Sequence, residues 1–384
     1  MKKRAIVLGC GLVGATMARE LANDPEFEVA AADFAQNNLN KLRDCGAVRT
    51  ICVDLNDPVR VKEVISDRDV VLGALPSRMG LQTLEAVIRG GKHYCDISFM
   101  PEDAMEMDSL AGKHGVTAVV DCGVSPGLSN MMVGHAVARM ERADRAVIYV
   151  GGLPKIRRWP YQYKAPFAPS DVIEEYTRPA RIVEDGKIVV KPALSDPELM
   201  DFPQVGTLEA FNTDGLRTLL GTVRVANMCE KTLRYPGHIE LIRVLRETGF
   251  FEQGEIEVNG VRVRPRDVTA KLLFPKWTYA HGEEEFTVLR VVVEGLHGEK
   301  PISYTYDLYD EYDRTCGASS MARTTGFPCV IVARMLASGR FAEHGVFAPE
   351  ALAQREGIFE IIVSELDRRG VKVRMNVQEV ATSS

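Results

Sequence analysis

The fold of this 384-residue chain is decided by the stretch Gly9-Cys10-Gly11-Leu12-Val13-Gly14. An apolar run at residues 5–8 precedes it and predicts a buried β-strand, and residues 11–22 follow with helical periodicity. Strand, glycine turn and helix together form the fingerprint of a dinucleotide-binding fold. Gly9 makes the tight turn, Gly11 lets backbone approach a pyrophosphate, and Gly14 permits close packing of the helix on the strand.

An acidic residue at the end of the second expected strand indicates which dinucleotide binds. Asp33 follows the run at residues 28–32, at the spacing from Gly14 where this fold places a carboxylate on the adenosine ribose. A carboxylate there repels a 2′-phosphate, and residues 34–38 contain no arginine to bind one. The sequence therefore predicts NAD rather than NADP as the cofactor. The residues expected to hold it here are Gly9, Gly11, Leu12, Val13, Gly14 and Asp33.

Short apolar runs alternate with amphipathic segments from residue 4 to about 120. Strands are expected at residues 5–8, 28–32, 48–53, 70–73, 93–96 and 117–120. Helices are expected at residues 11–22, 58–65, 81–89 and 101–114. This alternation predicts an α/β fold with a Rossmann-type, doubly wound parallel sheet.

The pattern changes after residue 127. A helix at 128–139 and a helix at 238–247 accompany longer alternating runs at residues 146–150, 181–190, 222–231, 287–294 and 302–309. These runs predict an α+β domain with a mostly antiparallel sheet. Helical segments at 320–336 and 352–368 are expected to return to the first domain. We therefore expect a dinucleotide-binding domain at 1–125, an inserted domain at 126–318 and returning C-terminal helices at 319–384.

Charge and cysteine usage exclude several classes of function. The chain has 47 Lys and Arg against 53 Asp and Glu, a net charge of −6, and no block of five or more like charges. This balance argues against nucleic acid or an anionic membrane as a partner. The eight cysteines are scattered, with no C-x-x-C pair, so we expect reduced thiols, no metal site and a cytoplasmic protein. The apolar run before Cys10 is too short for a secretion signal.

Polar residues follow several strands of the expected parallel sheet. Asp54 follows the third strand, and Leu75, Pro76 and Ser77 follow the fourth. Ligands bind at the carboxyl ends of such strands, so these residues are candidates for the cofactor site. Helix capping or a turn explains them equally well.

Two carboxylates are candidates for catalysis. Asp96, with Ser98 as a further cofactor contact, follows the fifth strand, and Asp121 follows the sixth in a turn rich in glycine and proline. A carboxylate near the reacting carbon would stabilise a developing positive charge. Capping or a structural hydrogen bond is the alternative for either aspartate.

The inserted domain carries further polar candidates. Arg234 could hold a substrate carboxylate through two parallel hydrogen bonds. His238 has an ordinary pKa near 6.5 and could exchange a proton at neutral pH, although an inert surface position fits it as well. The pair Tyr163 and Lys164 lies in an irregular segment, where a solvated surface is the default interpretation.

Several motifs jointly resemble the saccharopine dehydrogenase family. They are GCGLVG at 9–14, DCGVSPGLSN at 121–130, GGLP at 151–154, EEYTRPA at 174–180, EAFNTDGLR at 209–217, KTLRYPGH at 231–238 and MARTTGFP at 321–328. The resemblance covers residues 4 to about 350, and the last two motifs are the most specific. Within the family, the chain is most similar to the NAD-linked lysine 6-dehydrogenase branch.

The resemblance implies a Rossmann domain completed by C-terminal helices, an inserted substrate-binding and dimerisation domain, and a homodimer or homotetramer. It also implies oxidation or formation of a C–N bond beside a nicotinamide. In the lysine branch, the side-chain amine of L-lysine becomes the 6-semialdehyde and ammonia is released. The family's polar positions correspond here to Asp121, Lys164, Thr213, Asp214, Arg234 and His238. The basic stretch at 157–162 departs from the branch and leaves room for a more acidic substrate.

Two alternatives remain at the level of the sequence. One is a reductase that condenses an amino acid or polyamine with a carbonyl compound, as in the saccharopine- and carboxyspermidine-forming relatives. It would favour NADPH, which Asp33 disfavours. The other is a module that senses NAD without catalysis. Such a module could lose its polar groups, whereas Asp121, Arg234 and His238 are all present.

Overall fold

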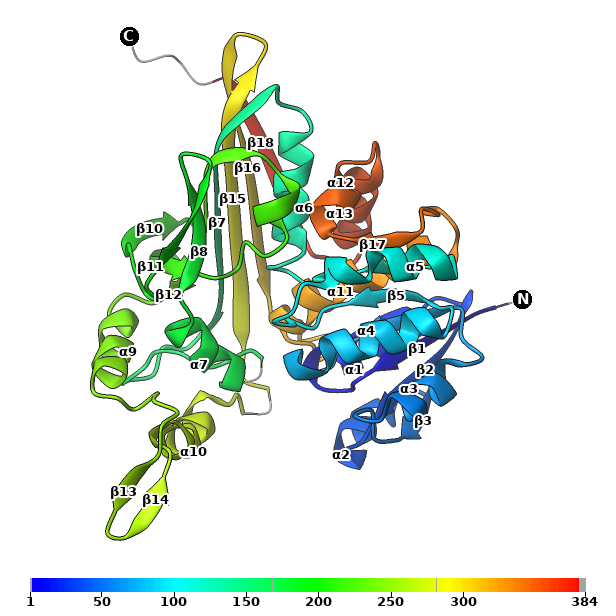
Figure 1. Ribbon diagram of the computed structural model, residues 1–384, viewed down its shortest axis with the longest axis horizontal. Helices are drawn as coiled ribbons and strands as arrows, with labels where there is room; N and C mark the ends of the chain where they lie inside the picture. The colour runs from blue at the N-terminus through cyan, green and yellow to red at the C-terminus, as the bar shows by residue number, and fades with distance from the viewer. Residues whose placement is uncertain (1, 168, 281, 380–384) are drawn as a thin grey trace. The chain divides into compact units, whose positions relative to one another are not determined.

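The computed structural model describes residues 2–167, 169–280 and 282–379. The chain forms two compact units (Figure 1). The first unit comprises Met1–Ala138 and Ala322–Lys372. The second comprises Arg139–Met321 and Val373–Ser384. The chain therefore leaves the first unit at Arg139 and returns to it at Ala322.

The first unit is built on a parallel sheet that has seven strands among the described residues, in the order β17-β6-β5-β4-β1-β2-β3. The strands are β1 (Lys3–Leu8), β2 (Phe27–Asp33), β3 (Val48–Cys52), β4 (Val70–Gly73), β5 (His93–Asp96), β6 (Thr117–Val119) and β17 (Gly345–Phe347). β1 pairs in parallel with β2 on one side and with β4 on the other. The strand order reverses beside β1, and doubly wound sheets bind ligands at such a point. The predicted fold class is confirmed.

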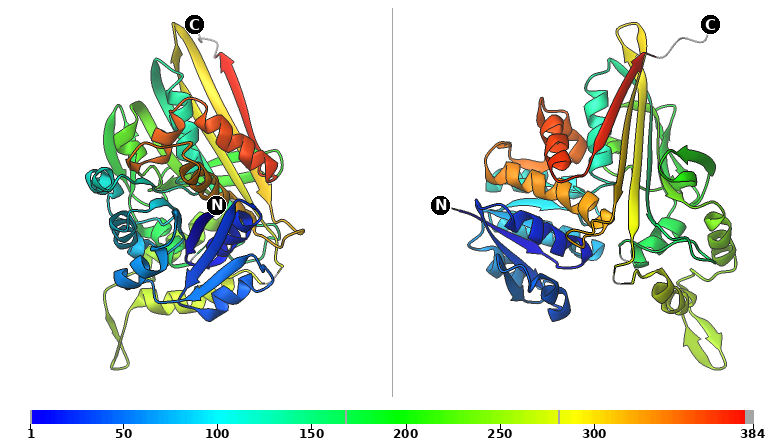
Figure 2. Two further views of the ribbon diagram at one scale, coloured as in Figure 1. Left: turned by 90° about the vertical axis from the view of Figure 1, so that its right-hand side faces the viewer. Right: turned by 180° about the vertical axis from the view of Figure 1, so that it is seen from behind.

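Helices join the strands of the first unit, and some come from the returning segment of the chain (Figure 2). They are α1 (Leu12–Ala22), α2 (Gln36–Leu39), α3 (Pro58–Ile65), α4 (Gly80–Arg89), α5 (Asp108–His114), α6 (Leu128–Val137), α11 (Ser320–Ala337), α12 (Pro349–Ala353) and α13 (Ile358–Arg368). Ile6 of β1 and Leu84 of α4 share one buried core with Val346 of β17. The returning segment thus completes the core as well as the sheet.

The second unit contains a mixed sheet of nine strands within the described ranges. They are β7 (Arg142–Pro154), β8 (Ala180–Glu184), β9 (Lys187–Lys191), β10 (Glu198–Phe202), β11 (Gly206–Thr213), β12 (Val225–Arg234), β15 (Glu285–His297), β16 (Lys300–Glu311) and β18 (Val373–Glu379). β12 pairs with β7 in parallel, and the other pairs of this sheet are antiparallel, as expected.

Helices and a separate hairpin complete the second unit. The helices are α7 (Pro169–Thr177), α8 (Leu219–Thr222), α9 (His238–Glu247) and α10 (Pro265–Trp277), and the hairpin consists of β13 (Ile256–Val258) and β14 (Val261–Val263). The aromatic side chains of Tyr176, Phe211 and Trp277 are buried in one core. Tyr176 of this core bonds to His238 and to Arg234, two of the residues that the sequence predicted for the site.

Three expected boundaries differ from the structure. α6 was expected to open the inserted domain, but it belongs to the first unit, so the division falls at Ala138 rather than at 125. The strand expected at 181–190 is the hairpin β8–β9, because Asp185 and Gly186 adopt positive φ and form a turn. The tail does not consist of helices alone, since β18 pairs with β16 in the second unit.

The described residues contain neither a candidate membrane span nor a candidate metal site. No helix in the part of the chain that the structure describes is long and apolar enough to cross a membrane. Over the same residues, no group of His, Cys, Asp and Glu side chains is arranged to hold a metal ion. All eight cysteines have free thiols.

Candidate functional site

The glycine turn between β1 and α1 leaves open space at one position. Gly9 has a φ of +93°, and a Cβ there would lie 2.4 Å from the carbonyl oxygen of Ala74. A Cβ on Gly14 would lie 1.9 Å from the carbonyl oxygen of Gly9. A Cβ on Gly11, in contrast, would meet no described atom within 4 Å. Packing within the chain explains Gly9 and Gly14, whereas the space at Gly11 fits a group that the chain itself does not supply.

The start of α1 offers hydrogen-bond donors beside that space. Gly11 is the N-cap and has no side chain to bond the first backbone N–H groups of the helix. Free N–H groups and the helix dipole favour a phosphate at this end. Leu12, 56% exposed, and the half-buried Val13 form the first turn. These features fit the pyrophosphate of NAD(P).

Asp33 is held at the end of β2 by backbone donors. Its Oδ2 accepts a hydrogen bond from the N–H of Cys10 at 2.7 Å, and its Oδ1 accepts one from Ala35 at 2.7 Å. The side chain is 5% exposed. The carboxylate is therefore fixed against the glycine turn.

The side chain of Lys41 is linked to Asp33 through Asn38. Asn38 donates from Nδ2 to Oδ2 of Asp33 at 3.2 Å, and Lys41 donates from Nζ to Oδ1 of Asn38 at 3.1 Å. Sequence reasoning considered only arginine at residues 34–38 and so missed Lys41. It also missed Phe34, which follows Asp33 directly and is 72% exposed. Both residues lie beside the expected adenosine position.

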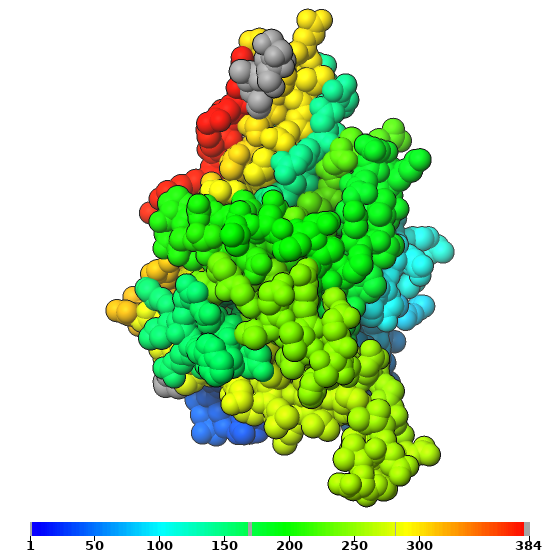
Figure 3. Space-filling model, turned by 90° about the vertical axis from the view of Figure 1, so that its left-hand side faces the viewer, coloured from blue at the N-terminus to red at the C-terminus, as the bar shows by residue number. Residues whose placement is uncertain are grey.

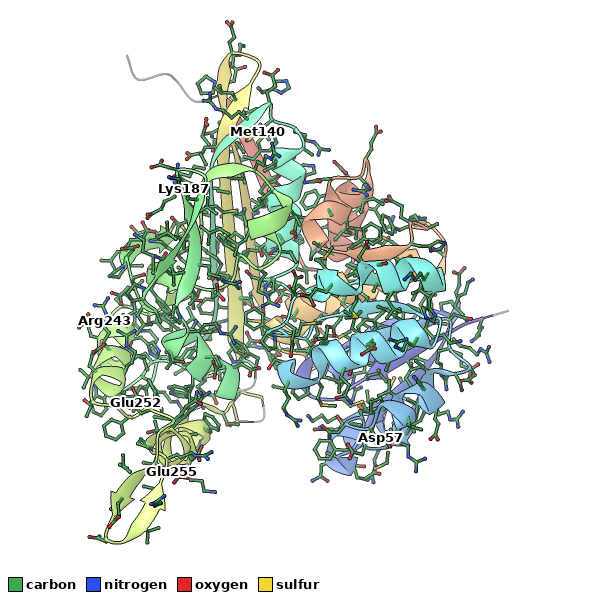
Figure 4. All side chains as sticks on the ribbon, viewed as in Figure 1. Asp57, Met140, Lys187, Arg243, Glu252 and Glu255 are labelled. Carbon is green, nitrogen blue, oxygen red and sulfur yellow. The ribbon has the colours of Figure 1, made fainter. Side chains whose placement is uncertain are left out.

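Other expected cofactor contacts are less directly placed. Asp54 is exposed and accepts hydrogen bonds from the backbone and side chain of Asn56, at 2.9 and 2.7 Å, which lower the pKa of its carboxyl group. Asp57, labelled in Figure 4, caps α3 in the same loop. Asp54 thus forms the turn that the alternative interpretation described. Leu75, Pro76 and Ser77 follow β4, as expected, and lead into a short 3-10 helix.

Asp96 is a fully buried carboxyl group at the end of β5. Its Oδ1 accepts a hydrogen bond from the hydroxyl of Tyr94 at 3.0 Å, and its Oδ2 accepts one from Ser98. Gly73 makes room for this cluster, because a Cβ there would lie 2.0 Å from the Tyr94 hydroxyl. Burial raises the pKa of Asp96 to about 7 against the effect of the Ser98 and Tyr94 hydrogen bonds, and the charge on Asp121 adds to the rise.

Asp121 lies close to Asp96, as the sequence predicted. The N–H of Cys122 donates to the backbone oxygen of Asp96 at 2.7 Å and so ties the ends of β5 and β6 together. Asp121 has a φ of 50°, in the left-handed region that few residues other than glycine adopt, and it is 4% exposed. Ser98, predicted as a cofactor contact, donates its hydroxyl hydrogen bond to Asp96 in this structure. The ends of β5 and β6 thus carry two neighbouring carboxyl groups, and burial raises the pKa of one of them, Asp96, to about 7.

Arg234 is buried at the end of β12 and is already strongly bonded. It donates from Nη2 to Glu175 at 2.7 Å and to Tyr163 at 3.3 Å, and from Nε to Tyr176 at 3.1 Å. Its Nη1 donates to the backbone oxygen of Leu233 at 2.9 Å. A guanidinium has five N–H donors. The bonds to described residues use four of them, so a bidentate grip on a substrate requires one of these bonds to open.

His238, the first residue of α9, is buried rather than exposed on the surface. Its Nδ1 lies 2.8 Å from the backbone oxygen of Tyr161, which can only accept, so Nδ1 carries the proton. Its Nε2 then accepts from the hydroxyl of Tyr176 at 2.8 Å. Burial, with the positive charge of Arg234, lowers the pKa of His238 to about 3. This corrects the expectation of proton exchange at neutral pH, because the imidazole stays neutral there.

Thr213 and Asp214 serve contacts within the second unit. The hydroxyl of Thr213 bonds to Thr232 at 2.9 Å and also to Glu230. Burial raises the pKa of Glu230 to about 8, although the Thr213 hydrogen bond opposes it. Asp214 accepts from Nε and Nη2 of Arg181 at 2.8 and 2.9 Å. The carboxylate of Asp214 is thus occupied by an arginine of its own unit.

Tyr163 and Lys164 are buried more than expected. Tyr163 is 4% exposed and lies with its ring 4.2 Å from the Arg234 guanidinium. Lys164 donates to Glu283 and, at 3.2 Å, to the backbone oxygen of Thr278. The default interpretation of this pair as solvated surface is therefore wrong. Sequence reasoning failed here because the pattern does not indicate which distant carboxylate will cover a cation.

Two aromatic donors near this pair were not predicted. The indole Nε1 of Trp277 and the hydroxyl of Tyr279 are both buried without a hydrogen-bond partner among the described residues. The Tyr279 ring lies 5.8 Å from Nζ of Lys164, and the Trp277 ring lies 5.8 Å from that of Tyr163. Buried donors are nearly always bonded, so these two have capacity for water or a ligand. Glu175 was also missed, although it lies in the 174–180 motif.

The first unit has the geometry of an NAD(P)-binding Rossmann domain. The second unit contains ion pairs that are largely buried. Together these features define the class of protein. Comparison with known protein families identifies the family within this class. The saccharopine dehydrogenase NADP binding domain matches residues 5–119, and the saccharopine dehydrogenase C-terminal domain matches residues 123–371. The chain belongs to the saccharopine dehydrogenase family.

Individual relatives are distant in sequence. The chain is 22% identical to saccharopine dehydrogenase [NADP(+), L-glutamate-forming] of Schizosaccharomyces pombe, over 90% of this chain and 93% of that protein. It is 20% identical to carboxyaminopropylagmatine dehydrogenase of a Synechocystis species, over 91% and 92% of the two chains. It is also 21% identical to the mouse mitochondrial alpha-aminoadipic semialdehyde synthase, over 91% of this chain but only 45% of that protein.

A solved structure supports the fold. The apo saccharopine dehydrogenase (L-Glu forming) of Saccharomyces cerevisiae superposes with a TM-score of 0.82 at 19% identity, over 99% of this chain and 100% of that chain. This agreement bears on the fold and not on the substrate. The names of the relatives include an NADP-linked enzyme.

Proposed function

We propose that the chain is an NAD-dependent oxidoreductase that oxidises the side-chain amine of an amino acid. The substrate proposed is L-lysine, which would yield its 6-semialdehyde and ammonia. The observation that carries the reaction class is the pair of neighbouring carboxyl groups, Asp96 and Asp121, at the strand ends of the dinucleotide-binding unit. Membership of the saccharopine dehydrogenase family supports it.

The preference for NAD rests on Asp33. Its carboxylate is fixed by two backbone N–H groups and would repel a 2′-phosphate. Phe34 offers an exposed aromatic face to an adenine beside it. Lys41 is the opposing feature, because it brings a cation to the same network through Asn38. We expect the fixed carboxylate to outweigh the exposed lysine, since the lysine is screened by solvent.

The carboxyl groups suit the charge changes of amine oxidation. The net change converts a CH2–NH3+ group and water into an aldehyde, ammonium, one hydride and one proton. When bound, a nicotinamide cofactor supplies the acceptor for the hydride. Loss of hydride leaves a positive iminium on the substrate, which an ionised Asp121 would stabilise. Asp96, with a pKa of about 7, can hold or release a proton at working pH.

The charge balance of the second unit favours a substrate that is itself cationic. Arg234 is paired with Glu175, Lys164 with Glu283 and Arg181 with Asp214. A substrate with several carboxylates would have to separate these pairs, and breaking the largely buried pairs of Arg234 and Lys164 is costly. Lysine brings two ammonium groups and a single carboxylate. This balance supports lysine over the bulkier acids that the condensing alternative would use.

A substrate screen tests the proposal. The purified chain is assayed for nicotinamide reduction with lysine, ornithine, saccharopine and polyamines, each with NAD+ and with NADP+. The expected result is the highest kcat/KM with L-lysine and NAD+, and one ammonia for each reduced nicotinamide. Faster oxidation of saccharopine would overturn the substrate assignment. Cofactor binding without turnover of any amine would favour the NAD-sensing alternative.

A further inference from the structure

Two buried hydrogen-bond donors in the second unit are not used within the chain. Helix α10 contributes to the surface of this unit (Figure 3), but its last residue, Trp277, is 0% exposed. The indole Nε1 of Trp277 and the hydroxyl of Tyr279 are shielded from solvent and have no hydrogen-bond partner among the described residues. Leaving a buried donor unpaired costs free energy. The pair therefore marks a place where hydrogen-bonding capacity is available to a ligand.

Aromatic rings hold the indole of Trp277 in a fixed orientation. The rings of Tyr161, Tyr163 and Tyr176 lie 5.9, 5.8 and 6.2 Å from it, each in an edge-to-face arrangement. The backbone N–H of Ala165 also donates to the backbone oxygen of Trp277 at 2.8 Å. The indole N–H thus has a set direction within the second unit, and a loose side chain does not explain its missing partner.

A cation and a carboxylate lie beside these donors. The Nζ of Lys164 lies 5.8 Å from the centre of the Tyr279 ring. It donates to Oε2 of Glu283 and, at 3.2 Å, to the backbone oxygen of Thr278. An ammonium has three N–H donors, so these bonds leave one of them for a ligand. The other carboxylate oxygen, Oε1 of Glu283, is buried and has no partner among the described residues.

The protonation of these groups follows from their contacts. Burial raises the pKa of Glu283, but the hydrogen bonds from Lys164 and from the N–H of Ala280 lower it overall, so the carboxylate is ionised at neutral pH. Burial, with the charges of Glu285 and Glu283, raises the pKa of Tyr279 well above its ordinary value. The Tyr279 hydroxyl therefore keeps its proton and can donate it to an acceptor.

We infer that four side chains of the second unit form a cluster that binds the head group of an α-amino acid. This head-group cluster consists of Lys164, Trp277, Tyr279 and Glu283. Its three available donors suit a carboxylate, which only accepts, and its one available acceptor, Oε1 of Glu283, suits the α-ammonium. A zwitterion also adds no net charge to the neutral pair of Lys164 and Glu283, whereas a second carboxylate would leave a buried charge uncompensated.

The cluster names the residues that would select the substrate class of the proposed function, and the inference rests on that function. Arg234 need not hold the α-carboxylate, because four of its five donors are used within the chain. The side chains of Lys164 and Glu283 remain 16% and 11% exposed, so a head group can reach the cluster from their side.

Trp277 itself can report the binding. The chain has two tryptophans, and the other, Trp159, is 87% exposed. In a Trp159→Phe background all tryptophan emission comes from Trp277. L-Norleucine, which has the head group of lysine without the side-chain amine, is titrated in the presence of NAD+. It should change the emission saturably. Hexanoate, without the ammonium, and norleucine amide, without the carboxylate, should bind at least about tenfold more weakly.

Two substitutions in that background assign the contacts. Tyr279→Phe removes a hydroxyl that has no described partner, so the melting temperature should not fall, while norleucine should bind about tenfold more weakly. Glu283→Gln should weaken norleucine to a similar degree but should not weaken hexanoate, which lacks the ammonium. The matched control is Tyr149→Phe, which removes a hydroxyl bonded to Glu198 at 3.2 Å and should leave norleucine affinity unchanged.

The outcomes separate this inference from the proposed function. No response of Trp277 to norleucine would overturn the inference, even if lysine is oxidised. Unchanged norleucine affinity in the folded Tyr279→Phe variant would also overturn it. The expected binding pattern without oxidation of any amine would support the head-group cluster and refute the proposed reaction.

Discussion

The guanidinium of Arg234 donates a hydrogen bond to the carboxylate of Glu175 at 2.7 Å, and the arginine side chain is 3% exposed. Tyr163 and Tyr176 bond to the same guanidinium, which makes it the centre of a buried polar cluster. Nearly all of its donors are used within the chain. Arg234 therefore stabilises the second unit in this conformation, whatever it does for a substrate.

Replacing Arg234 should destabilise the chain through the charge left behind. Arg234→Met leaves Glu175 without its cation, and the expected loss is about 3 kcal/mol in the free energy of unfolding, because removing one partner of a buried pair exposes the desolvation cost of the other. Arg234→Met/Glu175→Gln should recover part of that loss. Urea unfolding of the single and double variants measures this coupling. Strictly additive effects would show that the pair is energetically unimportant.

Replacing Asp33 should expose the contribution of Lys41 to cofactor choice. Asp33→Ser removes the charge that repels a 2′-phosphate, and NADPH affinity should then rise about tenfold while NADH affinity falls. In Asp33→Ser/Lys41→Ala the gain for NADPH should disappear, because Lys41 is the cation nearest that network. Fluorescence titration with both reduced cofactors gives the dissociation constants. Lys62→Ala, at an exposed position on α3, is the control. Tighter binding of NADPH than of NADH by the unmodified chain would refute the ribose assignment.

The raised pKa of Asp96 should appear in both activity and stability. Its carboxyl group is neutral below about pH 7 and charged above it, so kcat/KM should rise through that pH if the carboxylate is the active form. The folded pKa lies above the unfolded value of 3.8, so the native state holds this proton more tightly. The contribution to stability is therefore complete below about pH 4 and is lost as the pH rises through 7.

Asp96→Asn provides the comparison for both measurements. The variant should lose the limb near pH 7 from its rate profile, and its melting temperature should vary less between pH 4 and 7 than that of the intact chain. The limb that comes from deprotonation of the substrate amine should remain at higher pH, because the ordinary pKa of that amine is near 10.4. Identical pH profiles for the two proteins would assign the ionisation elsewhere.

Removing the charge of Asp121 should slow the chemical step. Asparagine tolerates a positive φ better than most residues, so Asp121→Asn should keep the turn at φ 50° while removing the negative charge. We expect kcat to fall by about a hundredfold, a typical loss for one group that stabilises transition-state charge, with NAD affinity nearly unchanged. A lowered melting temperature with normal turnover would instead indicate a structural role.

Local pattern was sufficient to predict the first unit. The strands at 70–73 and 93–96 have the predicted bounds, because buried parallel strands are short apolar runs between helices. The glycine turn could be located because its spacing follows from backbone geometry. The alternation at 181–190 predicts one strand, but the Asp185-Gly186 pair favours a turn and makes this segment the hairpin β8–β9.

The partners of the polar residues could not be predicted in the same way. Arg234 and Glu175 are separated by 59 positions in the chain, and Lys164 and Glu283 by 119. Such pairs form only when α7 and the strand ends pack together. The local periodicity of the sequence does not predict that packing. His238 illustrates the consequence, since its low pKa comes from burial beside Arg234 and not from its own sequence context.

The measurement that tests the central claim most directly is isotope transfer from the amine-bearing carbon. L-Lysine deuterated at carbon 6 is incubated with the intact chain and NAD+, and the reduced cofactor is analysed by mass spectrometry. If the chain oxidises the side-chain amine, the nicotinamide should gain one deuterium and ammonia should appear in equal amount. Reduced cofactor without deuterium, or no reduced cofactor from lysine at any pH, would contradict the account.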